Sequence, residues 1–327
     1  MVAEELHVLR AAEVHENPAE QPPWLIEPLW GAGAVGIIGG APKSCKTWLA
    51  LEMAVAVASG RPCLGRFRVP RPGPVLLFAA EDAPPQIKQR IESLAHARQT
   101  DFASLDVRLI VEPSLRLDLA QDLGRLRLTL EKHRPLLLVL DPYVRLQRAD
   151  ENDARQVSAI LSALRELSRT FQTAVALVHH ARKNAAELPG QALRGSGDFW
   201  AWGDSNLYVA RKREGLLLTV EHRSAASPAP IGLRLLTPQN GEQSPVRLEV
   251  NDDAASPDSA PLAECIVAHL RTHGPTPHRS LRGALHVRDA VLSEALRALE
   301  VAGRLVRTPG GWSLFDPPSL FPKPLSL

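Results

Sequence analysis

The sequence has few cysteines and no long apolar run. Its three cysteines, Cys45, Cys63 and Cys265, lie far apart in 327 residues. That spacing excludes a disulfide framework and a zinc knuckle, and it is typical of a reducing compartment. The longest apolar run, residues 48–58, is shorter than the ~20 residues that cross a bilayer. The first residues lack the basic and apolar regions of a signal peptide. We therefore expect a soluble, cytoplasmic protein with no membrane partner.

Charge of one sign is also scarce. The net charge is +2, and 23% of residues are charged against 45% that are hydrophobic, which is close to an ordinary globular composition. The chain is therefore no polycation, and it can bind nucleic acid only through a local patch or channel. Its length allows one large domain and one small domain.

The main pattern is an alternation of short apolar runs with longer helical segments. Continuous apolar runs separated by helices predict a mostly parallel sheet covered on both faces, which is an α/β fold. The predicted strands are 35–38, 75–80, 107–111, 136–140 and 174–178, and the predicted helices are 47–59, 85–98, 119–133 and 152–170.

The pattern changes after Arg194. Short runs joined by tight turns predict antiparallel strands that extend the sheet, at 207–210, 216–220, 233–236 and 246–250. Three helical segments and a glycine-turned hairpin then predict a small winged-helix domain. The predicted domains are a lead-in at 1–22, the α/β domain at 23–250, a linker of Asp, Ser, Ala and Pro at 251–260, the winged helix at 261–316 and a loose tail at 317–327.

A phosphate-binding loop follows the first strand. The segment from Gly40 to Thr47 fits the P-loop pattern except that Cys45 stands where glycine is expected. In such a loop Lys46 reaches the β- and γ-phosphates, and Thr47 binds Mg²⁺. A strand before it and a buried helix after it favour this interpretation over a fortuitous glycine turn. The predicted nucleotide-binding residues are Gly40, Ala41, Pro42, Lys43, Ser44, Cys45, Lys46, Thr47 and Trp48.

Polar side chains end three further strands. Asp141 follows a fully apolar run and would hold Mg²⁺ beside the P-loop. Glu81 ends the strand after the P-loop helix, where a carboxylate can act as general base; neighbouring Asp82 could share this task, and a solvated acidic turn is the alternative. His179 and His180 end the next core strand, either as sensors of the γ-phosphate or as a half-buried capping pair.

The order of these motifs resembles a known family. The set comprises Pro42-Lys43, Ala80-Glu81-Asp82, Leu140-Asp141-Pro142, Asp150-Glu151-Asn152 and Val178-His179-His180. It looks like the RepA-like AAA-family ATPases of plasmids, phages and integrated elements, which share the RecA and DnaB-type core. The resemblance covers about Pro23 to Arg223 and includes Arg194 to Gly197.

The resemblance implies a RecA-like P-loop core with ATP and Mg²⁺ as cofactors. It assigns nucleotide and metal binding to Lys46 and Thr47, metal support to Asp141, water activation to Glu81, and to His180 or His179 a link from the γ-phosphate to DNA-binding loops. The type member is a ring-shaped hexameric replicative helicase. A homo-hexamer with ATP between subunits and single-stranded DNA in its central channel is therefore implied.

Two positions depart from the family pattern. Cys45 replaces the P-loop glycine. Asp204 stands where the family has its arginine finger, so Arg211 or Arg213 on the following strand is expected to act in trans. The alternative for these two arginines is a solvated edge strand.

The candidate DNA contacts lie in the loop after the histidine strand. Arg182 and Lys183 are the expected phosphate contacts, and Trp200 and Trp202 are either stacking platforms or packing residues.

The winged helix supplies a second candidate surface. Arg288 begins its third helix, and Arg304 and Arg307 lie on its wing. This domain is expected either to contact DNA or to serve as a docking or oligomerisation module.

Together these features predict a DNA-dependent, Mg²⁺-dependent ATPase of a mobile element. We expect a hexameric helicase or replication-initiation factor that works with replication or recombination proteins. One alternative is a nucleotide-switched regulator or recombination mediator without helicase activity. Another is a binding module whose degenerate P-loop does not hydrolyse ATP.

Overall fold

The chain forms two compact units, Met1–Ala254 and Ala255–Leu327. The computed structural model describes residues 10, 23–147, 154–180, 198–212, 215–237, 245–251, 262–285, 287, 289–301 and 303–315. Within these ranges no helix combines the length and the apolarity needed to span a bilayer.

The first unit is built on one large sheet. Its strands are β3 (Val35–Gly40), β4 (Val75–Ala79), β5 (Val107–Leu109), β6 (Leu137–Asp141), β7 (Ala174–His180), β8 (Ser205–Lys212), β9 (Gly215–His222), β10 (Ile231–Leu236) and β11 (Arg247–Val250). Among the described residues the order is β11-β10-β9-β8-β3-β7-β6-β4-β5. From β8 to β5 the strands are parallel to one another, which confirms the predicted mostly parallel sheet.

One part of the strand prediction is wrong. β9, β10 and β11 are antiparallel as expected, but β8 runs parallel to β3, with Leu207 opposite Ile38. The reason is topological: β7 also pairs with β3, so the chain passes from one side of β3 to the other before it re-enters the sheet.

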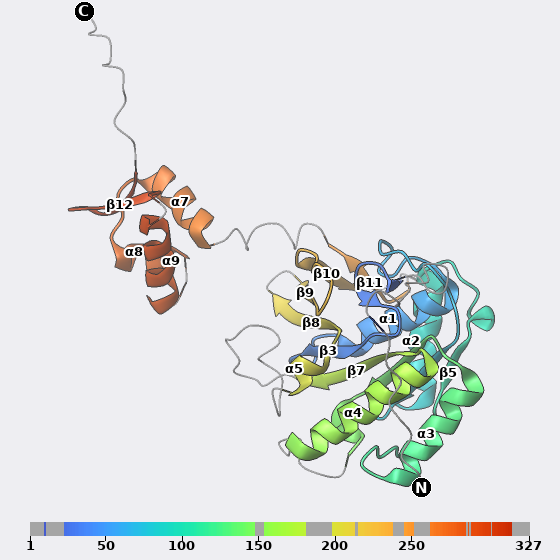
Figure 1. Cartoon of the computed structure of the whole chain (residues 1–327). Coiled ribbons are helices and arrows are strands. Elements are labelled where there is room, and N and C mark those ends of the chain that lie inside the picture. The colour runs from blue at the N-terminus through green and yellow to red at the C-terminus, as the bar shows by residue number, and fades with distance from the viewer. Residues whose placement is uncertain are drawn as a thin grey trace, which may run out of the picture. The chain divides into compact units, whose positions relative to one another are not determined.

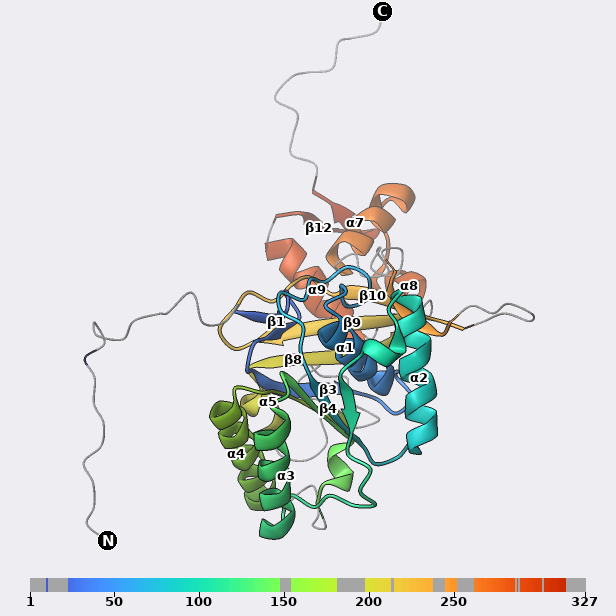
Figure 2. The ribbon, with the colours of Figure 1, turned by 90° about the vertical axis from the view of Figure 1, so that its right-hand side faces the viewer.

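Helices cover both faces of this sheet. They are α1 (Lys46–Ser59), α2 (Pro84–Ala97), α3 (Ala120–His133), α4 (Ala154–Phe171) and the short α5 (Asp198–Trp202). Figures 1 and 2 show α1 and α2 on one face and α3 and α4 on the other. The alternating side chains of the strands divide into two buried clusters accordingly; Ile38 belongs to the α1 side and Ile37 to the α4 side.

Helix α1 is buried nearly all round, as its uniformly apolar sequence predicts. It also carries a charge into the core. Glu52 is fully buried and accepts hydrogen bonds from Arg98 Nε at 2.8 Å and from the Leu64 amide at 2.7 Å. Arg98 in turn donates to the Leu248 carbonyl at 3.0 Å. This ion pair therefore joins α1 to the end of α2 and to β11.

A hairpin that the sequence pattern did not indicate precedes β3. Its strands are β1 (Trp24–Ile26) and β2 (Trp30–Gly31). They are too short to show alternation, although Ile26 and Trp30 are completely buried. Behind them, Gly36 lets β8 approach β3 closely, because a Cβ on that residue would lie 1.7 Å from the Ser205 carbonyl oxygen.

The second unit contains three helices and a two-stranded hairpin. These are α7 (Leu262–His273), α8 (His278–Leu285), α9 (Asp289–Val301), β12 (Leu305–Thr308) and β13 (Gly311–Leu314). A separate core that includes Leu281, Leu296 and Trp312 holds them together. β12 and β13 pair antiparallel across a turn that ends in Gly311, where φ is +117°. The unit thus has its own packed interior.

Candidate functional site

The P-loop lies at the carboxyl edge of the parallel strands, between β3 and α1. Here the structure gathers side chains from five segments around one open cleft of about 330 Å³. Such an edge is where open α/β sheets place their ligands. The cleft is lined by Lys43, Ser44, Cys45, Lys46, Thr47, Trp48, Glu81, Asp82, Arg90, Asp141, Val178 and His180.

The backbone of the loop is tightly curled. A Cβ on Gly40 would lie 2.3 Å from the Val209 carbonyl oxygen, so only glycine fits at this position. Lys43 and Cys45 both occupy the left-handed region, with φ of +63° and +65°. Glycine is favoured at the Cys45 position because this conformation is strained for a side chain. Burial raises the pKa of the half-buried Cys45 thiol, although Arg211 and Lys46 act in the opposite direction.

Lys46 points back across the loop that it ends. Its Nζ donates to the Ala41 carbonyl at 2.8 Å, and the residue is almost fully buried. Burial lowers the pKa of the ammonium group to about 8, against the opposing effect of Asp141, Glu81 and the Cys45 thiol. The hydroxyl of Ser44 is completely buried and, within the described part of the chain, has no hydrogen-bond partner. A buried cation beside an unused hydroxyl provides donors for the oxygens of a phosphate chain.

Thr47 and Asp141 meet although they lie 94 residues apart in the sequence. The Thr47 hydroxyl donates to Asp141 Oδ2 at 2.7 Å. Burial raises the pKa of Asp141 to about 6, more than the Thr47 hydrogen bond and Lys46 lower it. A hydroxyl and a carboxylate side by side at the base of a cleft are the oxygen ligands that Mg²⁺ prefers. These two residues could therefore hold a divalent metal, which would supply positive charge beside bound phosphates.

Glu81 and Asp82 differ in the ion pairs that their carboxylates form. Asp82 accepts two hydrogen bonds from Arg90, at 2.7 and 3.0 Å. Glu81 is half-exposed in the cleft and has a looser ion pair with Arg145 Nε at 3.5 Å. Asp82 is thus fixed against a helix, whereas the Glu81 carboxylate remains accessible beside the phosphate site.

The two histidines also lie in different environments. His179 is buried, stacks on Phe199 with ring centroids 4.3 Å apart, and meets Tyr143 edge-on at 5.6 Å. His180 is partly exposed and lines the cleft. Of the pair, His180 can therefore contact a nucleotide, while His179 packs beneath it.

Arg211 lies on β8 against the P-loop of its own chain. Its Nε donates to the Lys43 carbonyl at 2.9 Å. Asp204, at the amino end of the same strand, accepts from Arg165 at 2.9 Å and from the Val35 amide at 3.3 Å, so it is a structural residue. Arg213 lies outside the described residues.

The two tryptophans of α5 have different surroundings. Trp202 is buried and donates from its indole to the Leu161 carbonyl at 2.7 Å, so it is a packing residue. Trp200 is 51% exposed and donates to Glu221 at 2.9 Å. The loop residues Arg182 and Lys183, and Arg288 in the second unit, lie outside the described part of the chain.

The sequence interpretation missed one cleft residue and one partner of a cleft residue. Arg90 lines the cleft, and Arg145 pairs with the cleft residue Glu81 at 3.5 Å; neither belongs to a motif of its own. Arg90 lies on the helix that begins just after Asp82, and the sequence pattern did not single it out.

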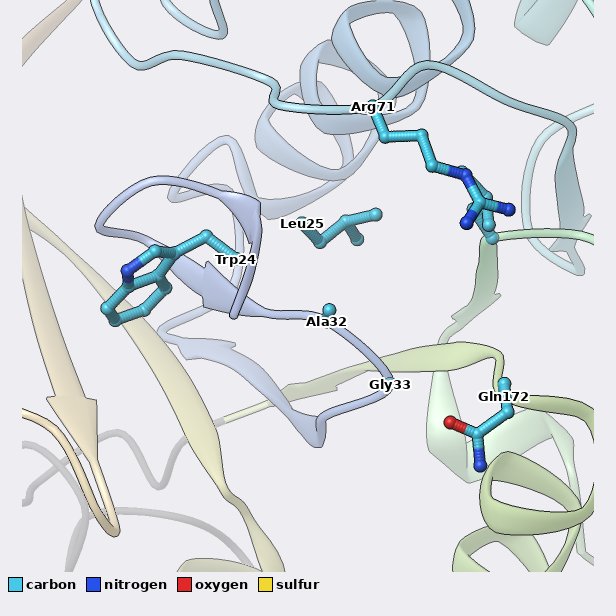
Figure 3. A pocket seen from close by; sticks show the side chains of 7 residues that line it. Trp24, Leu25, Ala32, Gly33, Arg71 and Gln172 are labelled. Atoms are coloured by element: carbon cyan, nitrogen blue, oxygen red, sulfur yellow. The ribbon is translucent and has the colours of Figure 1, made fainter. Parts of the chain in front are cut away.

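A second hollow lies at the opposite, amino edge of the sheet. Figure 3 shows it between the β1–β2 hairpin, Arg71 and Gln172. Its volume is about 20 Å³, close to that of a single water molecule, so it cannot accept a nucleotide.

A third hollow, of about 220 Å³, lies beside Trp200 and Glu221. The indole and the carboxylate there already bond to each other. The cleft at the P-loop is therefore the candidate active site.

Comparison with known proteins identifies the family. A family model described as AAA domain matches residues 3–186. Similar solved structures, each 16% identical, include the ATPase domain of G40P (63% of this chain, 82% of that chain, TM-score 0.49) and the RadB recombinase (67% and 92%, TM-score 0.48). A third is a DnaB-like replicative helicase studied with its interactions with primase (63% and 56%, TM-score 0.49). Because the family match spans more than half of its length, the chain belongs to the AAA domain family.

Proposed function

We propose that the protein hydrolyses ATP with Mg²⁺ at the P-loop cleft. The observation that carries this proposal is the contact of Thr47 Oγ1 with Asp141 Oδ2 at 2.7 Å, next to the buried Lys46. Lys46 binds the β- and γ-phosphates, and Thr47 and Asp141 hold the metal. When bound, the metal neutralises charge that develops on the phosphates. ATP and Mg²⁺ are the cofactors of this reaction.

Glu81 is the proposed general base. Its accessible carboxylate lies in the cleft, while Asp82 is already paired with Arg90 by two hydrogen bonds. A base must reach the water that attacks the γ-phosphate, directly or through one further water. His180, in the same cleft, is proposed to sense that phosphate.

Arg211 is proposed to steady the P-loop of its own subunit. The hydrogen bond from Arg211 Nε to the Lys43 carbonyl supports this role, because it ties the guanidinium to the P-loop of the same chain. Arg213 is then the candidate for the arginine that acts in trans, which in a ring accelerates hydrolysis by ~10³ to 10⁵.

DNA is the proposed stimulator of turnover. The motifs resemble RepA-like ATPases, and Arg182 and Lys183 follow directly on the strand that carries His180. Loops at this edge of the sheet are suited to contact single-stranded DNA in the channel of a hexameric ring. We propose a helicase or replication-initiation factor of a mobile element.

The second unit is proposed to be a winged helix that spans residues 261–316. Three helices followed by an antiparallel hairpin support this assignment. Arg307 lies over the Trp312 ring at 5.0 Å and, with Arg304, gives the hairpin a basic surface. Residues 1–22, 251–260 and 317–327 are proposed to be a lead-in, a linker and a tail around the two domains.

Steady-state ATP hydrolysis, with and without single-stranded DNA at low and moderate salt, tests the proposal. We expect DNA to stimulate turnover and salt to weaken the stimulation. Lys46→Ala should abolish turnover, and Glu81→Gln should keep nucleotide binding while losing hydrolysis. Normal hydrolysis by Glu81→Gln would refute the assignment of the base.

Strand separation distinguishes the remaining functions. Turnover that is not coupled to unwinding would identify a nucleotide-switched regulator or recombination mediator instead of a helicase. Nucleotide binding without any turnover would identify a scaffold whose P-loop is impaired by Cys45.

A further inference from the structure

A basic surface lies at the amino edge of the sheet, where strands β4, β6 and β7 begin. The three segments that lead into these strands, residues 60–74, 132–136 and 169–173, contain no acidic residue. The whole chain has a net charge of only +2, so positive charge is concentrated here. We call this surface the amino-edge patch. Its cations are Arg61, Arg66, Arg68, Arg71, Lys132, Arg134 and Arg169.

Hydrogen bonds hold the three segments of the patch side by side. The Leu136 amide donates to the Pro74 carbonyl at 2.8 Å, which joins the second segment to the first. The Thr173 hydroxyl donates to the Pro135 carbonyl at 2.7 Å, which joins the third segment to the second. The cations of the patch therefore belong to one continuous surface, although they come from three separate parts of the sequence.

The side chains of all these cations are exposed. Arg68 pairs with Glu27 of the β1–β2 hairpin at 3.0 Å, which neutralises one of the charges. Within the described part of the chain, Arg61, Arg71 and Arg169 form no ion pair. Figure 3 shows Arg71 at the rim of the small hollow at this edge. Because that hollow holds only about 20 Å³, a partner must lie across the patch and cannot enter a pocket.

The chemistry of the patch suits the phosphates of a duplex. Arginine predominates over lysine, and its planar guanidinium can donate two parallel hydrogen bonds to a phosphate. The two phenylalanines of these segments offer no bare ring to an unpaired base, because Phe67 is buried and Arg134 covers Phe171 at 5.3 Å. Single strands are bound by stacking their bases, whereas a duplex presents its phosphates outward. The patch therefore fits a duplex backbone.

The patch is far from the P-loop cleft. Helix α1 begins at the P-loop and its 14 residues end at Ser59, next to the first segment of the patch. A helix of this length spans about 21 Å. The proposed single-strand contacts Arg182 and Lys183 follow the carboxyl end of β7, which is also the other edge of the sheet. A duplex on the patch would leave the nucleotide cleft open.

We propose that the amino-edge patch binds the phosphate backbone of double-stranded DNA without regard to sequence. This surface is additional to the single-strand loop and the winged-helix hairpin of the proposed function. Binding at the patch requires neither nucleotide nor hydrolysis.

Fluorescence anisotropy of a short labelled DNA duplex, with the full-length protein and no nucleotide, tests this inference. Arg61→Ala, Arg71→Ala and Arg169→Ala should each weaken binding about fivefold at about 0.1 M salt, equally for duplexes of different sequence. Each lost phosphate contact lowers the slope of log affinity against log salt by about 0.9, so the triple variant should lower it by about 2.7. Arg71→Lys keeps the charge and should keep most of the affinity.

A matched control removes three exposed cations from other elements of the first unit. These are Lys88 on α2, Arg125 on α3 and Arg234 on β10. The control triple alanine variant has the same net charge as the patch triple variant, but it should bind the duplex as tightly as the wild type. Urea unfolding should give the same midpoint for both, because all six side chains are exposed.

Three results would overturn the inference. The first is a patch triple variant that binds the duplex as the wild type does. The second is an equal loss of affinity in both triple variants, because net charge alone would then explain binding. The third is a wild type that binds poly-glutamate more tightly than the duplex and loses that binding in the patch triple variant. This last result would identify an acidic protein as the partner.

ATP hydrolysis separates this inference from the proposed function. Without DNA, the patch triple variant should hydrolyse ATP at the wild-type rate, and Lys46→Ala should bind the duplex as the wild type does. Duplex binding that depends on the patch, in a wild type that hydrolyses no ATP, would overturn the proposed function alone. Hydrolysis without duplex binding at the patch would overturn this inference alone.

Discussion

Cys45→Gly should stabilise the first unit, because Cys45 has φ of +65° and ψ of +25° at the start of α1. The left-handed conformation costs an L-residue about 1–2 kcal/mol, and glycine avoids this strain. Glycine also gains freedom in the unfolded chain, which offsets about 0.4–1 kcal/mol of the benefit. The expected net gain is about 0.5–1 kcal/mol in the free energy of unfolding. The corresponding rise in melting temperature is about 2 °C for a domain of this size.

Urea unfolding followed by tryptophan fluorescence measures this gain. Five of the six tryptophans belong to the first unit, so the signal reports that unit. Cys45→Ala is the matched control: it removes the thiol but keeps a Cβ in the same backbone conformation, and it should not stabilise the protein. If Cys45→Ala stabilises as much as Cys45→Gly, the thiol and not the backbone strain is responsible. A loss of stability in Cys45→Gly would refute the conformational argument altogether.

Further predictions concern the core, the pH dependence, and Arg211 and Arg213. Arg98→Ala should cost about 3–5 kcal/mol in the same unfolding assay, because it leaves Glu52 buried without its cation, and Glu52→Gln in that background should recover part of the loss. The ammonium group of Lys46, with a pKa of about 8 in the free protein, loses its charge as the pH rises through that value. kcat/KM for ATP should therefore fall about tenfold per pH unit above 8, and a kcat/KM that stays constant to pH 10 would contradict the assignment. In mixtures with Lys46→Ala subunits, Arg213→Ala should regain hydrolysis, because its missing arginine comes from the neighbour. Arg211→Ala should not regain hydrolysis in such mixtures. Recovery of hydrolysis by Arg211→Ala would show that Arg211 acts in trans.

The apolar pattern of the sequence was sufficient to predict the segments that are buried on both faces of the sheet. The core strands are apolar throughout because helices cover both faces, and their boundaries agree with the predictions to within about two residues. The elements missed were the short ones, β1, β2 and α5, whose few residues cannot display a period. The parallel direction of β8 was also unpredictable, since an apolar run has the same sequence whichever neighbour it joins.

For the site as well, some residues could be proposed from the sequence and others could not. The P-loop, Asp141 and Glu81 could be proposed from sequence, because local motifs and strand ends specify their chemistry. The different roles of neighbouring residues could not be predicted. Which of Glu81 and Asp82 is bound to α2 depends on Arg90, and which histidine packs in the core depends on Phe199. These partners lie on other elements, so only folding brings them within bonding distance.

The sequence by itself thus determined the class of sheet, the phosphate loop and the order of the motifs, all of which follow from local pattern and spacing. The tertiary structure decided the contacts between distant segments. It brought Thr47 to Asp141, held Arg211 against its own P-loop and stacked Arg90 on Trp48. The physical reason is that a hydrogen bond or a stacking contact acts over only a few ångströms, and sequence spacing does not specify distances between residues on different elements.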